Sequence, residues 1–270
     1  MLNWIAKEVS SPTPYGVVHI IWAVVIIALI AFVLKFFKNT THKQNKILLL
    51  CTATLITVSE ILKQLAANLT VDGKWVEEYY WFTLPIVPCS FLLYTIWVVT
   101  FLDIDNKSSR RQKLIDISYL FIACYGFFSG LTALLVPHSI FDTPKLIIII
   151  NTMIFHGLYI VIGVYLFWCG RAKVDHKNFL LAQIIFLIWF VVAAIANLIV
   201  NNMFPDIYFN AIFISPNYAP EIPIVSVFYE HFPWIVWVVV YYIGYTLSSY
   251  IIMLFAQCLS IAKKFVQKNS

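Results

Sequence analysis

Long apolar runs, separated by shorter polar stretches, repeat along almost the whole chain. An α-helix needs roughly 20 predominantly apolar residues to cross a bilayer core about 30 Å thick. Seven runs reach that length, at residues 16–37, 47–67, 81–102, 115–136, 146–170, 179–203 and 234–258. The pattern predicts an all-α membrane protein, in which residues 1–270 form one polytopic domain, a bundle of seven transmembrane helices.

Composition and charge support this class and add an orientation. Hydrophobic residues make up 61% of the chain and charged residues only 11%, which is far from the composition of a soluble domain. Most of the 18 Lys and Arg residues lie in the first, third and fifth loops and in the C-terminal tail. The positive-inside rule then predicts an N-terminus outside and a C-terminus in the cytoplasm. This basic rim accounts for the net charge of +5, so no nucleic-acid partner is expected.

The stretch 204–233 is the long connection between predicted helices, and it lies on the outer side. It contains aromatic residues and no Lys or Arg, and five prolines interrupt it, at Pro205, Pro216, Pro220, Pro223 and Pro233. We expect it to fold back over the outer mouth as a lid-like loop or shallow re-entrant segment. An aromatic belt at the level of the lipid headgroups is the alternative.

Polar side chains gather in the outer half of the predicted spans. An ionisable group at the centre of a membrane helix costs about 2.5–3.5 kcal/mol on insertion scales, so each one is a candidate for function. The set comprises His19, Glu60, Lys63, Cys89, Asn151, His156 and Asn197. Lys63 lies one turn after Glu60, so the two side chains can meet, either as a structural ion pair or as part of a site. The asparagines could equally hold helices together, and His19 could face headgroups.

Cys89 and His156 have the residue types of an acyl-transfer site. Pro85 and Pro88 precede the cysteine, and a proline at position 88 is expected to kink or open the helix beside the thiol. An imidazole can convert a thiol to the thiolate that attacks a carbonyl carbon. The sequence does not show whether the two side chains touch.

Several short motifs resemble those of the YwaF-like integral membrane family of bacteria, which is similar to the animal transmembrane protein 164 acyltransferases. The matching positions are Leu84-Pro85 with Cys89-Ser90, Pro88-Cys89, His156, Asn210 with Phe213 and Pro216, Pro233-Trp234 and, near the start, His19. The resemblance implies lipid acyl chemistry, with Cys89 as nucleophile and His156 as base.

The preferred interpretation is an intramembrane lipid acyltransferase or hydrolase acting on glycerolipid esters at the outer leaflet. Asn197 or Asn210 would stabilise the oxyanion or orient the substrate, and Glu60 would orient either His156 or Lys63. Membrane lipids, phospholipids in particular, are the expected partners, and no cofactor or metal is expected. The richness in Ile, Phe, Lys and Asn is typical of a low-GC bacterium, so the multi-pass chain is expected in a bacterial plasma membrane.

Other functions fit the same residues. A small-molecule or lipid transporter or receptor would use the outer polar cluster as a binding site, and a structural subunit would bind nothing there. His19, Glu60, Cys89 and His156 are also acceptable zinc ligand types, although their positions on four helices give no spacing to check.

Overall fold

The structure is a computed structural model that describes residues 3–37, 39–77, 79–103, 108–138, 141, 143–220 and 223–269. Within these ranges, the described side chains do not include those of Phe82, Pro88, Cys89, Pro223, Ile224 and residues 261–269.

Helices make up the regular structure of the described ranges, apart from two isolated β-bridges. They are α1 (Val17–Phe36), α2 (His42–Ala67), α3 (Pro88–Leu102), α4 (Ser109–Phe121), α5 (Phe127–Leu135), α6 (Leu146–Trp168), α7 (His176–Met203), α8 (Pro223–His231) and α9 (Trp234–Asn269). Six of the helical segments described are long and apolar enough to cross a membrane, with α4 and α5 counted as one. The prediction of an all-α, multi-pass membrane protein is therefore confirmed.

The third predicted span differs from the expectation, because no single helix covers residues 81–102. A short 3₁₀ turn at Trp81–Thr83 is followed by non-helical backbone, and α3 begins only at Pro88. The residue before a proline is disfavoured in the α region, and Val87 is accordingly extended, with φ −116° and ψ 159°. Pro88 takes the first helical position, where its missing N–H costs nothing. With 15 residues, α3 is only about 22 Å long, so the described part of the chain has six long candidate spans and the short apolar helix Ser90–Leu102.

The fourth predicted span is the central helix of the bundle. It runs from α4 through a π-helical turn at Ile122–Gly126 into α5, and 72% of its apolar window is buried, against 22% for α1 and for α9. Gly130 lets α5 approach α6, since a Cβ at this position would lie 2.5 Å from the backbone oxygen of His156. This close packing fixes the backbone that carries His156.

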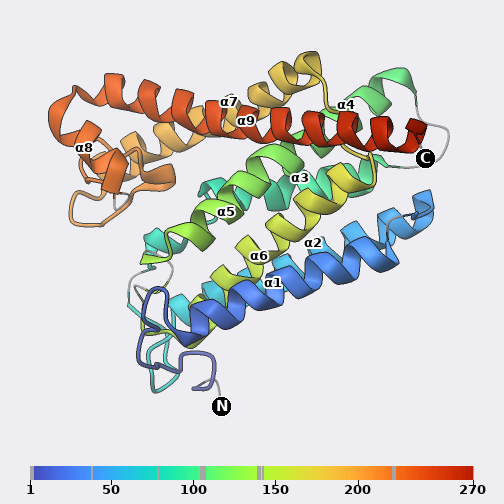
Figure 1. The fold of residues 1–270 in the computed structure, drawn as a ribbon. Helices are drawn as coiled ribbons and strands as arrows, with labels where there is room; N and C mark the ends of the chain where they lie inside the picture. The colour runs from blue at the N-terminus through green and yellow to red at the C-terminus, as the bar shows by residue number, and fades with distance from the viewer. Residues whose placement is uncertain are drawn as a thin grey trace.

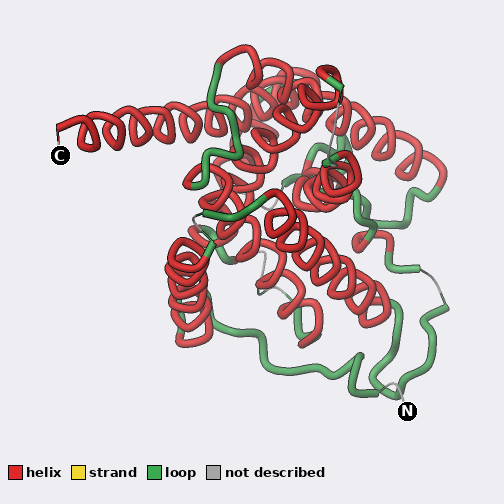
Figure 2. The backbone as a smooth tube through the Cα atoms, turned by 90° about the vertical axis from the view of Figure 1, so that its right-hand side faces the viewer, coloured by secondary structure: helices red, strands yellow, loops and turns green. Residues whose placement is uncertain are grey.

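The helices form two groups that meet along the central helix, where α7 packs against α4, and α9 against the π-helical turn and α5. Figure 1 shows α1, α2, α5 and α6 running side by side, with α7 and α9 together on one side of them and α8 next to the start of α9. Aromatic rings fill the contact among α7, α9 and the central helix. The ring centroid of Phe186 on α7 lies 4.8 Å from that of Tyr245 on α9 and 5.0 Å from that of Tyr125 in the π-helical turn. The C-terminal end of α9 extends past the other helices (Figure 2).

Opposite ends of α2 and α6 are held by different polar contacts. At the start of α2, Asn45 donates to Tyr119 at 2.7 Å and accepts from Tyr165 at 2.9 Å, and Tyr119 donates to Asp103 at 2.9 Å. At the other end, the ammonium of Lys145 donates to three backbone carbonyls at the end of α2. Burial lowers the pKa of Lys145 from its ordinary value. These contacts fix the two helices whose facing sides carry the site described next.

Candidate functional site

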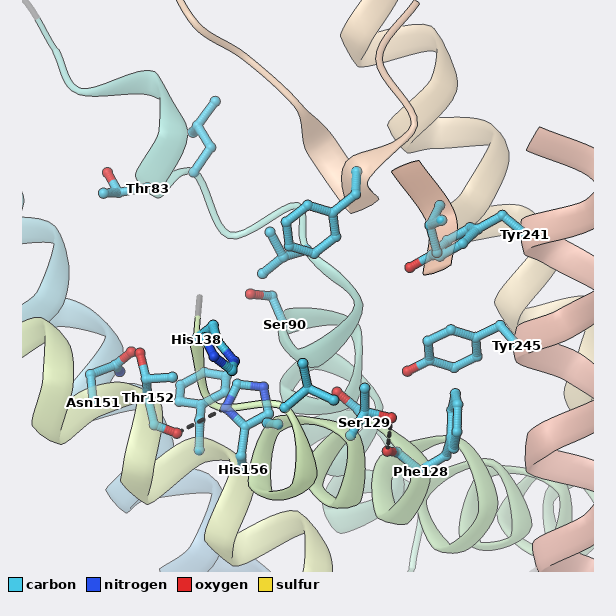
Figure 3. A pocket seen from close by; sticks show the side chains of 18 of the residues that line it. Thr83, Ser90, Phe128, Ser129, His138, Asn151, Thr152, His156, Tyr241 and Tyr245 are labelled. Atoms are coloured by element: carbon cyan, nitrogen blue, oxygen red, sulfur yellow. Dashed lines mark hydrogen bonds between the residues drawn. The ribbon is translucent and has the colours of Figure 1, made fainter. Parts of the chain in front are cut away.

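A cavity of about 870 Å³ lies between α2, α5, α6 and α9. The segment before α3 and residues of the stretch 204–233 complete its wall. This volume is within the range of small-molecule sites, about 300–1,000 Å³. Figure 3 shows polar side chains of α3 and α6 on one side of the cavity and tyrosines of α9 on the other.

Four of the residues singled out from the sequence line this cavity together. They are Glu60 and Lys63 on α2, and Asn151 and His156 on α6. The Glu60 carboxylate lies 2.7 Å from the Lys63 ammonium, and Asn151 donates to Ser59 on α2 at 3.1 Å. Residues nearly a hundred positions apart in the chain therefore form one polar wall.

His156 is held in one orientation by its own helix. Its Nδ1–H donates to the backbone oxygen of Thr152 at 2.9 Å, because a carbonyl oxygen can only accept. In a neutral imidazole the second nitrogen is then an acceptor, and this Nε2 has no protein hydrogen bond among the described residues. The ring nitrogen that does not bond Thr152 is directed away from α6, toward the cavity (Figure 3). An imidazole in this state can accept a proton from a group in the cavity.

The first turn of α3 forms the next part of the wall. Val87 and Ser90 both line the cavity, so the backbone of Cys89 lies between two lining residues, at the second position of the helix. The Cys89 side chain itself lies outside the described side chains. The first N–H groups of a helix lack intrahelical partners and carry the positive end of the helix dipole, an environment that stabilises a thiolate.

Ser90 has an unusual hydroxyl. The residue is only 1% exposed, and its Oγ has no hydrogen-bond partner among the described residues. A buried polar atom without a partner costs about 1–3 kcal/mol, and such atoms are rare in native proteins. Ser90 nevertheless lies in the wall of the cavity, as Figure 3 shows.

His19 lies away from this cavity. Its Nε2 lies 2.9 Å from the backbone oxygen of Leu134, and its ring packs between Tyr15 and Phe141. His19 does not line the cavity. Among the described residues, no group of three or more His, Cys, Asp or Glu side chains is placed to hold a metal ion.

Asn197 and Asn210 also lie outside the cavity wall, and both use their amides on backbone. Asn197 donates to the oxygen of Ala211 at 2.9 Å and accepts from its N–H at 2.8 Å. Asn210 accepts from the N–H of Ser215 at 2.9 Å. Between these contacts Phe213 has a positive φ of 62°, a strained conformation, and lines the cavity. The two asparagines therefore fix the stretch that carries Phe213.

Several polar residues of the cavity wall were not expected from the sequence, among them His138, Tyr241 and Tyr245. Tyr241 and Tyr245 on α9 direct their hydroxyls toward the cavity, opposite His156 and Ser90 (Figure 3). Together with Trp237 they repeat every four residues, so they share one face of α9. That spacing is a visible signal, but an aromatic stripe in an apolar helix is equally typical of a packed core.

The sequence profile of the TMEM164 family matches residues 14–256. This match covers α1 to α8, most of α9 and every candidate residue named above, and it confirms the resemblance expected from the short motifs. Neither a curated protein nor a solved structure matches the chain. The matched segment spans most of the sequence, and the chain therefore belongs to the TMEM164 family.

Proposed function

We propose that this protein is an intramembrane lipid acyltransferase or hydrolase that uses Cys89 and His156 on glycerolipid esters. The observation that carries the proposal is the cavity shared by the accepting Nε2 of His156 and the first turn of α3, which contains Cys89. The family resemblance adds support, because it implies lipid acyl chemistry at the same two positions.

The reaction would proceed through a thioester. His156 Nε2 takes the thiol proton, and the Cys89 sulfur attacks the ester carbonyl carbon to form a tetrahedral intermediate. When this collapses, the alcohol leaves with the proton from His156, and the acyl group remains on sulfur. A water molecule or a lipid hydroxyl then attacks the thioester, gives its proton to His156 and releases the acyl product, after which the thiol regains the proton. The Thr152 carbonyl keeps Nδ1 protonated throughout.

We assign the stabilisation of the oxyanion to the Ser90 hydroxyl. It is a donor without a partner among the described residues, on the turn that carries Cys89. Asn197 and Asn210, the amides first expected in this role, are committed to the backbone of the stretch 204–233. Their part in the proposal is to hold this stretch over the substrate.

The membrane arrangement is part of the same proposal. The 3₁₀ turn at Trp81–Thr83, the extended segment and α3 together make a third crossing, which completes seven. With the N-terminus outside, as the distribution of basic residues favours, the cavity opens toward the outer leaflet of a bacterial plasma membrane. The aromatic side of the cavity, including Phe128 and Tyr241, suits an acyl chain.

The direct test replaces Cys89 with Ala and measures acyl release from labelled phospholipid in proteoliposomes. Because the nucleophile is lost, we expect turnover to fall by about three orders of magnitude or more. The matched control is Cys51→Ala, since Cys51 is exposed on α2 and away from the cavity. Turnover by the Cys89→Ala protein at the wild-type rate would refute the acyl-transfer mechanism.

The size of the cavity also suits a binding protein, either a transporter or a receptor for a lipid or small molecule. A thiol-reactive lipid probe separates the two functions. If Cys89 is an activated nucleophile, the probe labels it selectively. In a protein that only binds its ligand, the five cysteines react according to their exposure.

A further inference from the structure

Two partly buried lysines near the end of α2 use their ammonium groups differently. An ammonium has three N–H donors. Lys145 donates to the backbone oxygens of Ala66, Ala67 and Leu69, at 2.8, 3.1 and 2.9 Å, so all of its donors are committed. Lys63 has one contact, 2.7 Å to Glu60, among the described residues. Lys63 therefore keeps two donors, and its side chain lines the cavity.

The position of Lys63 is fixed by its neighbours. The Glu60 oxygen that contacts Lys63 also accepts from Gln64 at 2.7 Å. Gln64 in turn donates to the backbone oxygen of Thr83, beside the segment that leads to Cys89. The Lys63 and Glu60 side chains are only 12% and 9% exposed. The ammonium is thus held at the wall by a network that joins α2 to the segment before α3.

A charged pair inside a membrane span needs an explanation, because its attraction is offset by the cost of desolvating the two charges. Apolar residues of the same volume would often make the fold equally or more stable. A structural pair would be expected to point its donors at protein acceptors, as Lys145 does. Lys63 instead faces a cavity whose far side is lined by aromatic residues such as Phe128 and Trp237. A cationic end and an aromatic end within one cavity match an anionic amphiphile.

We propose that Lys63 binds the phosphate group of a glycerophospholipid, and so selects phosphate-bearing lipids over neutral glycerides. The inference rests on the proposed function, since it places the headgroup of the same lipid. The two remaining N–H groups of Lys63 donate to phosphate oxygens, and charge-assisted bonds of this kind are strong in a low dielectric. Glu60 holds Lys63 in place but opposes the phosphate charge, so it is a positioning residue.

The test measures binding in a Cys89→Ala background, where acyl transfer cannot interfere. The probes are dihexanoyl-phosphatidylglycerol and dihexanoylglycerol, which differ by the phosphate-bearing headgroup, titrated into purified protein in detergent by calorimetry. We expect the phospholipid to bind more tightly. Lys63→Met should weaken its binding about tenfold or more, whereas Lys63→Arg should keep it. Glu60→Gln should keep or tighten it, because a negative charge is removed.

Opposite effects at Lys63 and Glu60 distinguish a phosphate site from a structural pair. If Glu60 and Lys63 formed only a structural pair, Glu60→Gln and Lys63→Met would weaken phospholipid binding equally, and that result overturns the inference. So does equal binding of the two probes, or tighter binding of inorganic phosphate alone than of the phospholipid, which would assign the site to the free ion. Lys145→Met is the control, expected to lower thermal stability without changing the preference between probes. If Lys63→Met does not fold, the Glu60→Gln and Lys63→Arg results still decide.

Failure of this inference is separate from failure of the proposed function. If Cys89→Ala leaves turnover unchanged while binding depends on Lys63, the cavity binds phospholipid without the thiol chemistry. If turnover depends on Cys89 while binding ignores Lys63, the chemistry stands and the headgroup site does not.

Discussion

At the scale of single residues, the chemistry depends on one hydrogen bond that sets a tautomer. The Thr152 carbonyl holds Nδ1–H of His156, so the accepting nitrogen is free to face the cavity. Because the acceptor is a backbone carbonyl, substituting a side chain does not remove this restraint. The pH dependence of the reaction is therefore the most direct probe of His156.

We expect kcat/KM to fall as the pH is lowered through the pKa of His156. Protonated His156 has no lone pair to accept the thiol proton, so the active fraction decreases. The measurement is kcat/KM for acyl release against pH, compared between wild type and His156→Gln. The variant should lose roughly 10²–10⁴-fold in rate and the acid limb with it. An unchanged acid limb in the variant would show that another group titrates.

Ser90 gives a prediction in which activity and stability separate. Ser90→Ala removes a buried hydroxyl that has no partner among the described residues, so thermal stability should be equal or higher. If the hydroxyl donates to the oxyanion, kcat should nevertheless fall by about 10²–10³-fold. Parallel measurements of melting temperature and kcat test this. A variant that keeps wild-type kcat would remove Ser90 from the mechanism.

At the scale of elements, the break before α3 and the inner face of α9 shape the cavity. Pro88 starts α3 instead of kinking a longer helix, so the segment ahead of it is free to form part of the wall. On α9, the lining residues include the large Trp237, Tyr241 and Tyr245 and the small Gly244 and Ser248. A Cβ at Gly244 would have no heavy atom within 4 Å, so this part of the cavity can be filled without a clash.

Gly244 therefore allows a test of where the acyl chain lies. Gly244→Ala should keep turnover and keep or raise stability, since glycine in a helix is worse than alanine by roughly 0.5–1 kcal/mol. Gly244→Phe should lower kcat/KM for long-chain lipids about tenfold or more, while dihexanoyl lipids are spared, because hydrophobic pockets discriminate by bulk. Equal losses for both chain lengths would place the chain elsewhere.

At the scale of the whole molecule, the helices follow from local pattern, but the site does not. The predicted spans 146–170 and 179–203 agree closely with α6 and α7, because about 20 apolar residues in a membrane have few alternatives to a helix. The prolines at 85 and 88 predicted a disruption, but its form, a full helix start, depends on what packs around it. The π-helical turn at Ile122–Gly126 left no signal, since it is set by tertiary packing.

The grouping of candidate residues was only partly predictable, for a related reason. Depth in the membrane follows from position along a span, so it brought Glu60, Asn151 and His156 together into the outer half of the membrane. Rotation about the helix axis does not follow from depth. His19 shares the outer half of the membrane, yet it bonds to Leu134, 115 residues away. Likewise, the commitment of Asn197 to Ala211 depends on the path of a loop.

The central claim is that Cys89 carries the acyl group during turnover, and the most direct measurement is to look for it there. Purified protein would be incubated with phospholipid bearing a labelled acyl chain, quenched in acid and digested, and its cysteine peptides analysed by mass spectrometry. We expect the acyl mass on Cys89 and its release by hydroxylamine, with no adduct on Cys51 or in the Cys89→Ala protein. Turnover of the same lipid by Cys89→Ala protein, with no acylated Cys89 in wild type, would contradict the account.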